Sequence, residues 1–198
     1  MATASKVRTR ETRERSRQRI IRAAAELVRE RSFAELNVAE VMARAGIGRT
    51  LFYRHFDDLG DLLVRAGRQA IEELYEAQVK LASTRVDLGR DAVRQAVELP
   101  VAVYRRHGPV LRAVAEAAAA DPSLTPNQEM IRRSFDELVA DALRNSGRTF
   151  NDVSETARAL NLLNEGYLLS AFGREPRISE ETAVATLTEI WVGALGVG

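Results

Sequence analysis

Cysteine is absent from this chain of 198 residues, and histidine occurs only twice. Without cysteine the chain has no disulfide, no thiolate zinc site and no cysteine nucleophile. No further metal ligands cluster with His55 or His107, so the sequence indicates no zinc centre. Glycine-rich phosphate loops and nucleophile elbows are also missing. We therefore expect neither an enzyme nor a bound cofactor or metal.

Long apolar runs are missing as well. No stretch reaches the roughly 18 consecutive apolar residues that a membrane span requires, and the N-terminus lacks the apolar core of a signal peptide. A composition of 45% apolar and 29% charged residues is that of a globular chain. We expect no membrane association and a cytoplasmic location.

Positive charge is unevenly placed along the chain. The net charge is +1, yet residues 1–22 contain eight basic and two acidic residues, a net of +6. Lysine supplies only Lys6 and Lys80, so the other cations are arginines. A basic head on an acidic body indicates a polyanionic partner for the head. A solvated, disordered arm without a partner is the alternative.

Apolar residues recur at helical spacing throughout, and no stretch alternates as a strand would. We predict an all-α fold of about nine helices. Their expected positions are Thr12 or Ser16 to Arg31, 38–45, Arg49–His55, 58–81, Asp91–Arg106, a short helix after His107-Gly108-Pro109, Gln128–Asn145, Asn151–Phe172 and Ser179–Val197. We expect a linker or turn over Ser83–Asp91, and Pro100 predicts either a kink or a break. The predicted organisation is a flexible basic arm (1–11), a small helical domain (12–58) and a larger one (59–198).

Residues 37–56, NVAEVMARAGIGRTLFYRHF, are the most informative segment. Asn37 and Glu40 have the spacing of a capping box, and Gly46 can end a helix in the left-handed conformation. Two short helices joined by a glycine-containing turn are typical of a helix-turn-helix, whose second helix enters the major groove of DNA. An ordinary helical hairpin with a solvated face is the alternative. The residues that we expect to pack between the two helices and fix the angle between them, the packing set, are Val41, Ala45, Ile47 and Phe52.

This segment resembles the N-terminal domain of the TetR family of bacterial transcriptional regulators, and AGIGRTLFYRHF is close to that family's turn and recognition helix. The resemblance implies a homodimer that binds a palindromic operator and releases it when a small molecule enters the C-terminal domain. The DNA contacts that we expect are Arg17, Asn37, Val38, Gly48, Arg49, Thr50, Leu51, Tyr53 and His55. Two positions depart from the family pattern. Gly48 stands where members often have Ser or Thr, and it caps the recognition helix more weakly than Ser would. Leu59 stands where many members have a lysine that contacts phosphate.

The C-terminal segment has a second, narrower resemblance. Residues 159–196 are similar to the last two helices of the mycobacterial repressors of ethionamide activation, which implies an elongated, mostly apolar effector pocket with two asparagines as polar anchors. Asn161 and Asn164 share a helical stripe with Ala157 and Leu168 and need polar partners: solvent, a second protomer or a ligand. The ligand-binding residues that we predict are Val97, Tyr104, Phe135, Leu138, Asn161, Asn164, Leu169 and Trp191.

These patterns predict a regulator with two functional surfaces. We expect a ligand-responsive DNA-binding repressor that dimerises through its last two helices. Because none of the expected pocket residues is charged, we expect a neutral, elongated, hydrophobic effector. The long helix after Asp58 is the expected lever between pocket and DNA-binding unit, and Trp191 suits either the core or the pocket wall. The alternative is a helical small-molecule-binding or scaffolding protein that does not bind an operator.

Overall fold

The computed structural model describes residues 2–83, 89–146 and 148–196, and this part of the chain is helical without any strand. The α-helices are α1 Ala2–Glu30, α2 Val38–Ala45, α3 Leu59–Ser83, α4 Arg90–Ala120, α5 Thr125–Asn145, α6 Val153–Phe172 and α7 Glu180–Leu195. Three short 3-10 helices join them: η1 Phe33–Glu35, η2 Arg49–Arg54 and η3 Pro122–Leu124. The predicted all-α class is confirmed. The linker expected after Ser83 lies largely outside the described residues.

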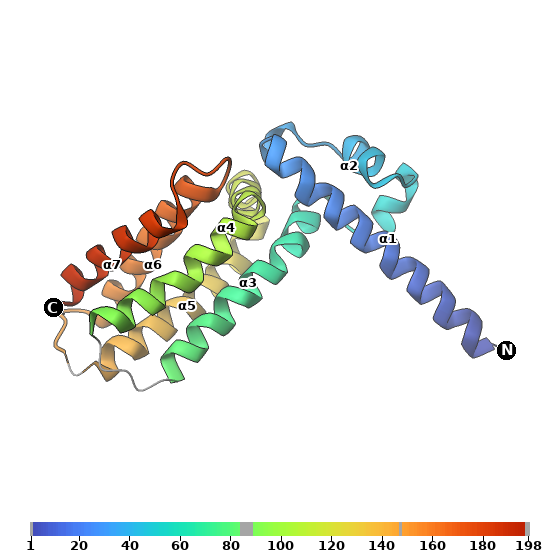
Figure 1. Ribbon diagram of the computed structural model, residues 1–198. Coiled ribbons are helices and arrows are strands. Elements are labelled where there is room, and N and C mark those ends of the chain that lie inside the picture. The colour runs from blue at the N-terminus through green and yellow to red at the C-terminus, as the bar shows by residue number, and fades with distance from the viewer. Residues whose placement is uncertain (1, 84–88, 147, 197–198) are drawn as a thin grey trace.

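A small head is formed by α1, α2 and η2 (Figure 1). The predicted apolar stripe of α1 is fully inside its core, because Ile20, Ala24, Leu27 and Val28 are all buried. The start that we predicted for this helix is wrong. The backbone is already helical at Ala2, so α1 continues through the basic segment that we expected to be a flexible arm, and its N-terminal part projects away from the molecule.

The predicted cap of α2 is half confirmed. Asn37 Oδ1 accepts a hydrogen bond from the Glu40 amide at 3.0 Å. The Glu40 carboxylate accepts a hydrogen bond from Arg31 Nη1 at 2.7 Å, so its side chain turns toward α1. At the other end Gly46 takes the left-handed conformation, with φ 64°, as the sequence predicted.

The largest departure from prediction is α4. We expected two helices separated at His107-Gly108-Pro109, but one helix runs from Arg90 to Ala120 through Pro100 and Pro109. Figure 1 shows its first part from the side and its last part end-on, so the helix bends. Each proline removes one backbone hydrogen bond and crowds the preceding turn, which kinks a helix without ending it when packing holds both halves.

The rest of the chain forms a body of five helices, α3 to α7. Asp58 Oδ1 caps α3 by accepting a hydrogen bond from the Asp61 amide at 2.8 Å, as expected for one of the two candidate aspartates. Helices α6 and α7 lie side by side on one flank, farthest from the head (Figure 1). In the described residues no helix is long and apolar enough to cross a membrane.

Head and body share part of their core. The final segment of α4 contributes Val110, Ala113, Val114 and Ala117 to the same apolar cluster as α1 and α2. The body has its own cluster, in which α3 and α4 pack on α6 and α7. The last turns of α4 therefore lie between the two units.

Candidate nucleic-acid interface and ligand pocket

The head holds α2 and η2 in a helix-turn-helix arrangement. Of the predicted packing set, Val41, Ala45 and Phe52 are buried and Ile47 packs partly against the same core. The turn between the two helices is held from outside by Arg19 of α1, whose Nη2 donates hydrogen bonds to Ala45 O at 2.7 Å and Gly46 O at 3.3 Å. A guanidinium at the C-terminal end of α2 also opposes the negative end of the helix dipole.

Most of the predicted contact residues lie on the outer face of this arrangement. The exposed ones are Asn37, Gly48, Arg49, Thr50 and Tyr53, and the half-buried ones are Arg17, Val38, Leu51 and His55. Tyr53 is 63% exposed, with its ring edge against buried Phe52 at a centroid distance of 5.3 Å. Leu51 packs partly on the head core, so only part of its side chain is available to a base.

His55 closes η2 in an electropositive environment. Burial lowers the pKa of its imidazole, and the nearby Arg13 and Arg17 lower it further. The ring is therefore neutral at pH 7 and offers DNA one N–H donor without a full charge.

Two arginines of α1 have an internal role that the sequence reasoning missed. Arg19 holds the turn, and Arg13 Nη2 donates to Arg54 O at 3.1 Å, at the end of η2. We had counted both only as part of the basic charge of the N-terminal segment. No local pattern signals these bonds, because donor and acceptor are 26 and 41 residues apart.

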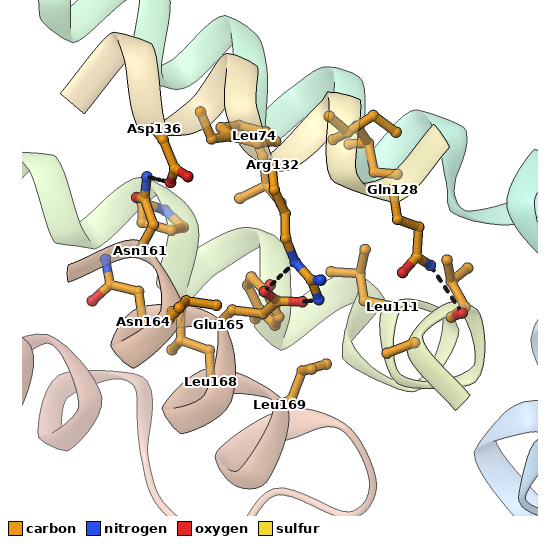
Figure 2. A pocket seen from close by; sticks show the side chains of 18 of the residues that line it. Leu74, Leu111, Gln128, Arg132, Asp136, Asn161, Asn164, Glu165, Leu168 and Leu169 are labelled. Carbon is orange, nitrogen blue, oxygen red and sulfur yellow. Dashed lines mark hydrogen bonds and ion pairs between the residues drawn. The ribbon is translucent and has the colours of Figure 1, made fainter. Parts of the chain in front are cut away.

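The body contains a partly open cavity of about 160 Å³ (Figure 2). Its walls come from four helices, α3, α4, α5 and α6. The lining residues are Val64, Ile71, Leu74, Pro100, Tyr104, Leu111, Val114, Ala115, Gln128, Ile131, Arg132, Phe135, Asp136, Arg158, Asn161, Leu162, Asn164, Glu165, Leu168 and Leu169. The wall from α3 was not anticipated, because an apolar stripe does not reveal which part of a helix faces a cavity.

Five of the eight predicted ligand-binding residues line this cavity: Tyr104, Phe135, Asn161, Asn164 and Leu169. The other three do not. Val97, Leu138 and Trp191 of α7 do not line it, but the indole N–H of Trp191 donates to Asn164 Oδ1 at 3.0 Å. The final helix therefore supports the wall instead of closing it.

The expectation of an uncharged wall is wrong. Arg132 of α5 and Glu165 of α6 form a two-pronged ion pair, with N–O distances of 3.1 and 3.0 Å, across the middle of the cavity (Figure 2). Asp136 and Arg158 also line it. Hydrogen bonding and the charge of Glu165 raise the pKa of Arg132 despite partial burial.

The orientation of both asparagine amides follows from their partners. Trp191 can only donate, so Asn164 uses its oxygen there and presents its amide N–H₂ group elsewhere. Asn161 Nδ2 donates to Asp136 Oδ1 at 2.8 Å, which leaves its carbonyl oxygen available. One end of the cavity thus offers a hydrogen-bond donor and an acceptor side by side (Figure 2).

Comparison with known proteins finds a matching family for the head and another for most of the body. Residues 20–66 match the family described as "Bacterial regulatory proteins, tetR family", and residues 93–196 match "Transcriptional regulator EthR, C-terminal domain". The chain belongs to the TetR family of bacterial transcriptional regulators. The HTH-type transcriptional regulator EthR of Mycobacterium tuberculosis is 31% identical over 186 residues, covering 89% of this chain and 85% of that protein.

Other TetR relatives extend this similarity over nearly the whole chain. EthR of Mycolicibacterium smegmatis is 27% identical over 215 residues, covering 98% of this chain and 96% of that protein. A TetR-like regulator from a Rhodococcus species shares the fold with a TM-score of 0.73 and 20% identity, over 91% of this chain and 96% of that one. The TetR regulator PfmR of Thermus thermophilus has a TM-score of 0.72 and 20% identity, over 86% and 96%. Members of the TetR family bind operator DNA and small-molecule effectors and are typically dimers.

Proposed function

We propose that this TetR regulator is a repressor that binds a palindromic operator as a homodimer and leaves it when a hydrophobic small molecule occupies the cavity. The main support is the exposed face of Arg49, Thr50 and Tyr53, which a buried core and the bonds of Arg13 and Arg19 hold in position. Regulation of transcription places the protein with the DNA in the cytoplasm.

Roles within the DNA interface follow from side-chain chemistry. Arg17, Asn37, Tyr53 and His55 supply donors to phosphate oxygens, together with the backbone at Val38 and Gly48. Arg49 can bind guanine with both arms of its guanidinium, and the methyl groups of Thr50 and Leu51 suit the methyl group of thymine. In the described residues Arg49 has no ion pair that would compete with a base for its guanidinium.

Dimerisation through α6 and α7 explains their exposed apolar faces. Leu163 is 38% exposed on α6, and Ile190 is 37% exposed on α7. A Cβ added at Gly166 or Gly193 would meet no atom within 4 Å, so small residues leave room for a close helix partner. Twofold pairing of these faces would bury both and form a four-helix interface.

The switch requires that cavity and head be mechanically linked. Val114 lines the cavity and is also part of the head core with α1 and α2. The α3 lever that we expected contributes Val64 and Gly67 beside it, and a Cβ on Gly67 would lie 3.0 Å from Val114 Cγ2. A ligand that moves Val114 shifts α1 relative to α3. Operator affinity falls if the distance between the two recognition helices of the dimer in this ligand-bound state no longer matches the operator.

Binding to the DNA upstream of the protein's own gene, measured by fluorescence anisotropy, tests the proposal. We expect tight binding with steep salt dependence. Arg49→Ala should remove about 1–3 kcal/mol of discrimination at one symmetric position in each half-site, whereas Arg133→Ala on α5 of the body should change nothing. No specific binding by the wild-type protein would favour the scaffolding alternative. Equal weakening on all sequences would make Arg49 a phosphate contact.

A further inference from the structure

A mostly buried tyrosine in the cavity wall has a hydroxyl without a hydrogen-bond partner among the described residues. Tyr104 of α4 lines the cavity and is only 8% exposed. No group in the described part of the chain hydrogen-bonds to its phenol oxygen, so the O–H group is available to a ligand in the cavity. A buried O–H without a partner is costly, whereas a ligand atom that accepts its proton removes that cost.

The charges around Tyr104 determine what it can bind. Burial raises the pKa of Tyr104 above its usual range, and Glu165 raises it further. The phenol therefore keeps its proton at every physiological pH and acts as a donor. Beside it, Arg132 uses Nε and Nη2 for Glu165 and keeps the two N–H groups of Nη1 free of that pair. Tyr104 and Arg132 line the same cavity and act on each other electrostatically, so two neighbouring donor groups are available to a ligand.

A ligand group with a full negative charge is disfavoured beside Tyr104 and Arg132. Glu165 pairs with Arg132, and Asp136 also acts on Arg132 from the end of the cavity that holds Asn161, so one cation is offset by two carboxylates. Arg158 restores neutrality over the whole cavity, but its side chain is exposed to water and forms no ion pair in the described residues. An added carboxylate would be desolvated next to like charges, which costs far more than one unmade hydrogen bond.

We infer that the effector has an uncharged acceptor, a carbonyl oxygen of a ketone, ester or amide, that binds Tyr104 Oη and Arg132 Nη1, and that free carboxylic acids are rejected. This inference rests on the proposed function, since it concerns the same cavity. Tyr104 and Glu165 are then the residues that set specificity. An apolar part of the effector lies toward Leu111 on one side of the ion pair, whereas the donor and acceptor of Asn164 and Asn161 lie on the other side (Figure 2).

Three probes of nearly equal shape test the inference: para-butylacetophenone, para-butylethylbenzene and para-butylbenzoate. Binding is measured by calorimetry and by the rise in Tm at pH 7.5. We expect the ketone to bind most tightly, the hydrocarbon more weakly and the benzoate the most weakly of the three. Tyr104→Phe should weaken ketone binding about fivefold, the worth of one neutral hydrogen bond, and leave the hydrocarbon unchanged. Circular dichroism and the Tm without ligand verify that this variant is folded.

Glu165→Gln provides a gain-of-function test. It keeps the size of the side chain and removes one negative charge, so the benzoate should now bind at least about tenfold more tightly than to the wild-type protein. If Tyr104→Phe weakens ketone and hydrocarbon equally, or if the wild-type protein binds benzoate as well as ketone, the inference is overturned while the proposed regulator remains. If none of the probes binds, both the inference and the effector cavity are refuted, although operator binding is not.

Discussion

Replacing Arg19 with alanine should loosen the turn between α2 and η2 without removing a DNA contact. The strong bond lost is the one from Nη2 to Ala45 O at 2.7 Å, since the second, to Gly46 O, is longer and exposed. One charged hydrogen bond at a partly solvated site, together with the helix dipole, is worth about 1 kcal/mol. The Tm should therefore fall by about 2–4 °C in a chain of this length.

Operator binding separates this positioning role from a phosphate contact. Each phosphate contact contributes about 0.9 to the slope of log K against log salt concentration. Arg19→Ala should lower affinity at every salt concentration and leave this slope unchanged, because the guanidinium is used inside the protein. Arg22→Ala, an exposed arginine of the same helix, is the matched control and should not change the Tm. A reduced slope with an unchanged Tm would show that Arg19 binds DNA.

Three further predictions concern packing, pH and assembly. Gly108→Ala should destabilise the protein by about 3 kcal/mol or more in urea unfolding, because its Cβ would lie 2.2 Å from Phe172 O. Gly67→Ala, whose Cβ would lie 3.0 Å from Val114 Cγ2, should cost less and is the comparison. The pKa of His55 is lowered from 6.5, so the stability that its neutral imidazole contributes is present above about pH 6.5 and is lost as the pH falls toward the lowered pKa. His55→Gln should therefore flatten the fall in Tm between about pH 7 and 5. An unchanged pH profile would contradict this prediction. Leu163→Asp should convert the dimer to monomers in sedimentation at micromolar concentration, because burial of each of the two leucine side chains contributes about 1.5–3 kcal/mol to association. Met130→Asp on α5 is the control and should remain dimeric. A dimeric Leu163→Asp variant would exclude this interface.

The sequence by itself determined the local structure of the head. The caps of Asn37 and Gly46 and the apolar spacing of α1 depend on residues within a few turns of one another, so periodicity and backbone preference identify them directly. The same reasoning placed Tyr104 and Asn161 near a ligand pocket, although that pocket was inferred from resemblance as much as from pattern.

Features that depend on how helices pack against one another could not be predicted from local sequence patterns. The sequence marks Gly108-Pro109 as a break, yet α4 continues, because Gly108 allows its backbone to pack against the end of α6 at Phe172. The start of α1 was missed for a different reason, since the basic segment has no apolar stripe to indicate a helix.

Tertiary structure alone decided the chemistry of the cavity. Arg132 and Glu165 are 33 residues apart and look like two solvated charges in the sequence, but the pairing of α5 with α6 brings them together across the cavity. The same packing gives the asparagines protein partners and leaves the Tyr104 hydroxyl without a hydrogen bond to any described residue. Helical periodicity specifies which face of a helix is buried, whereas the partners of a buried polar group depend on the relative position of two helices, which no local pattern encodes.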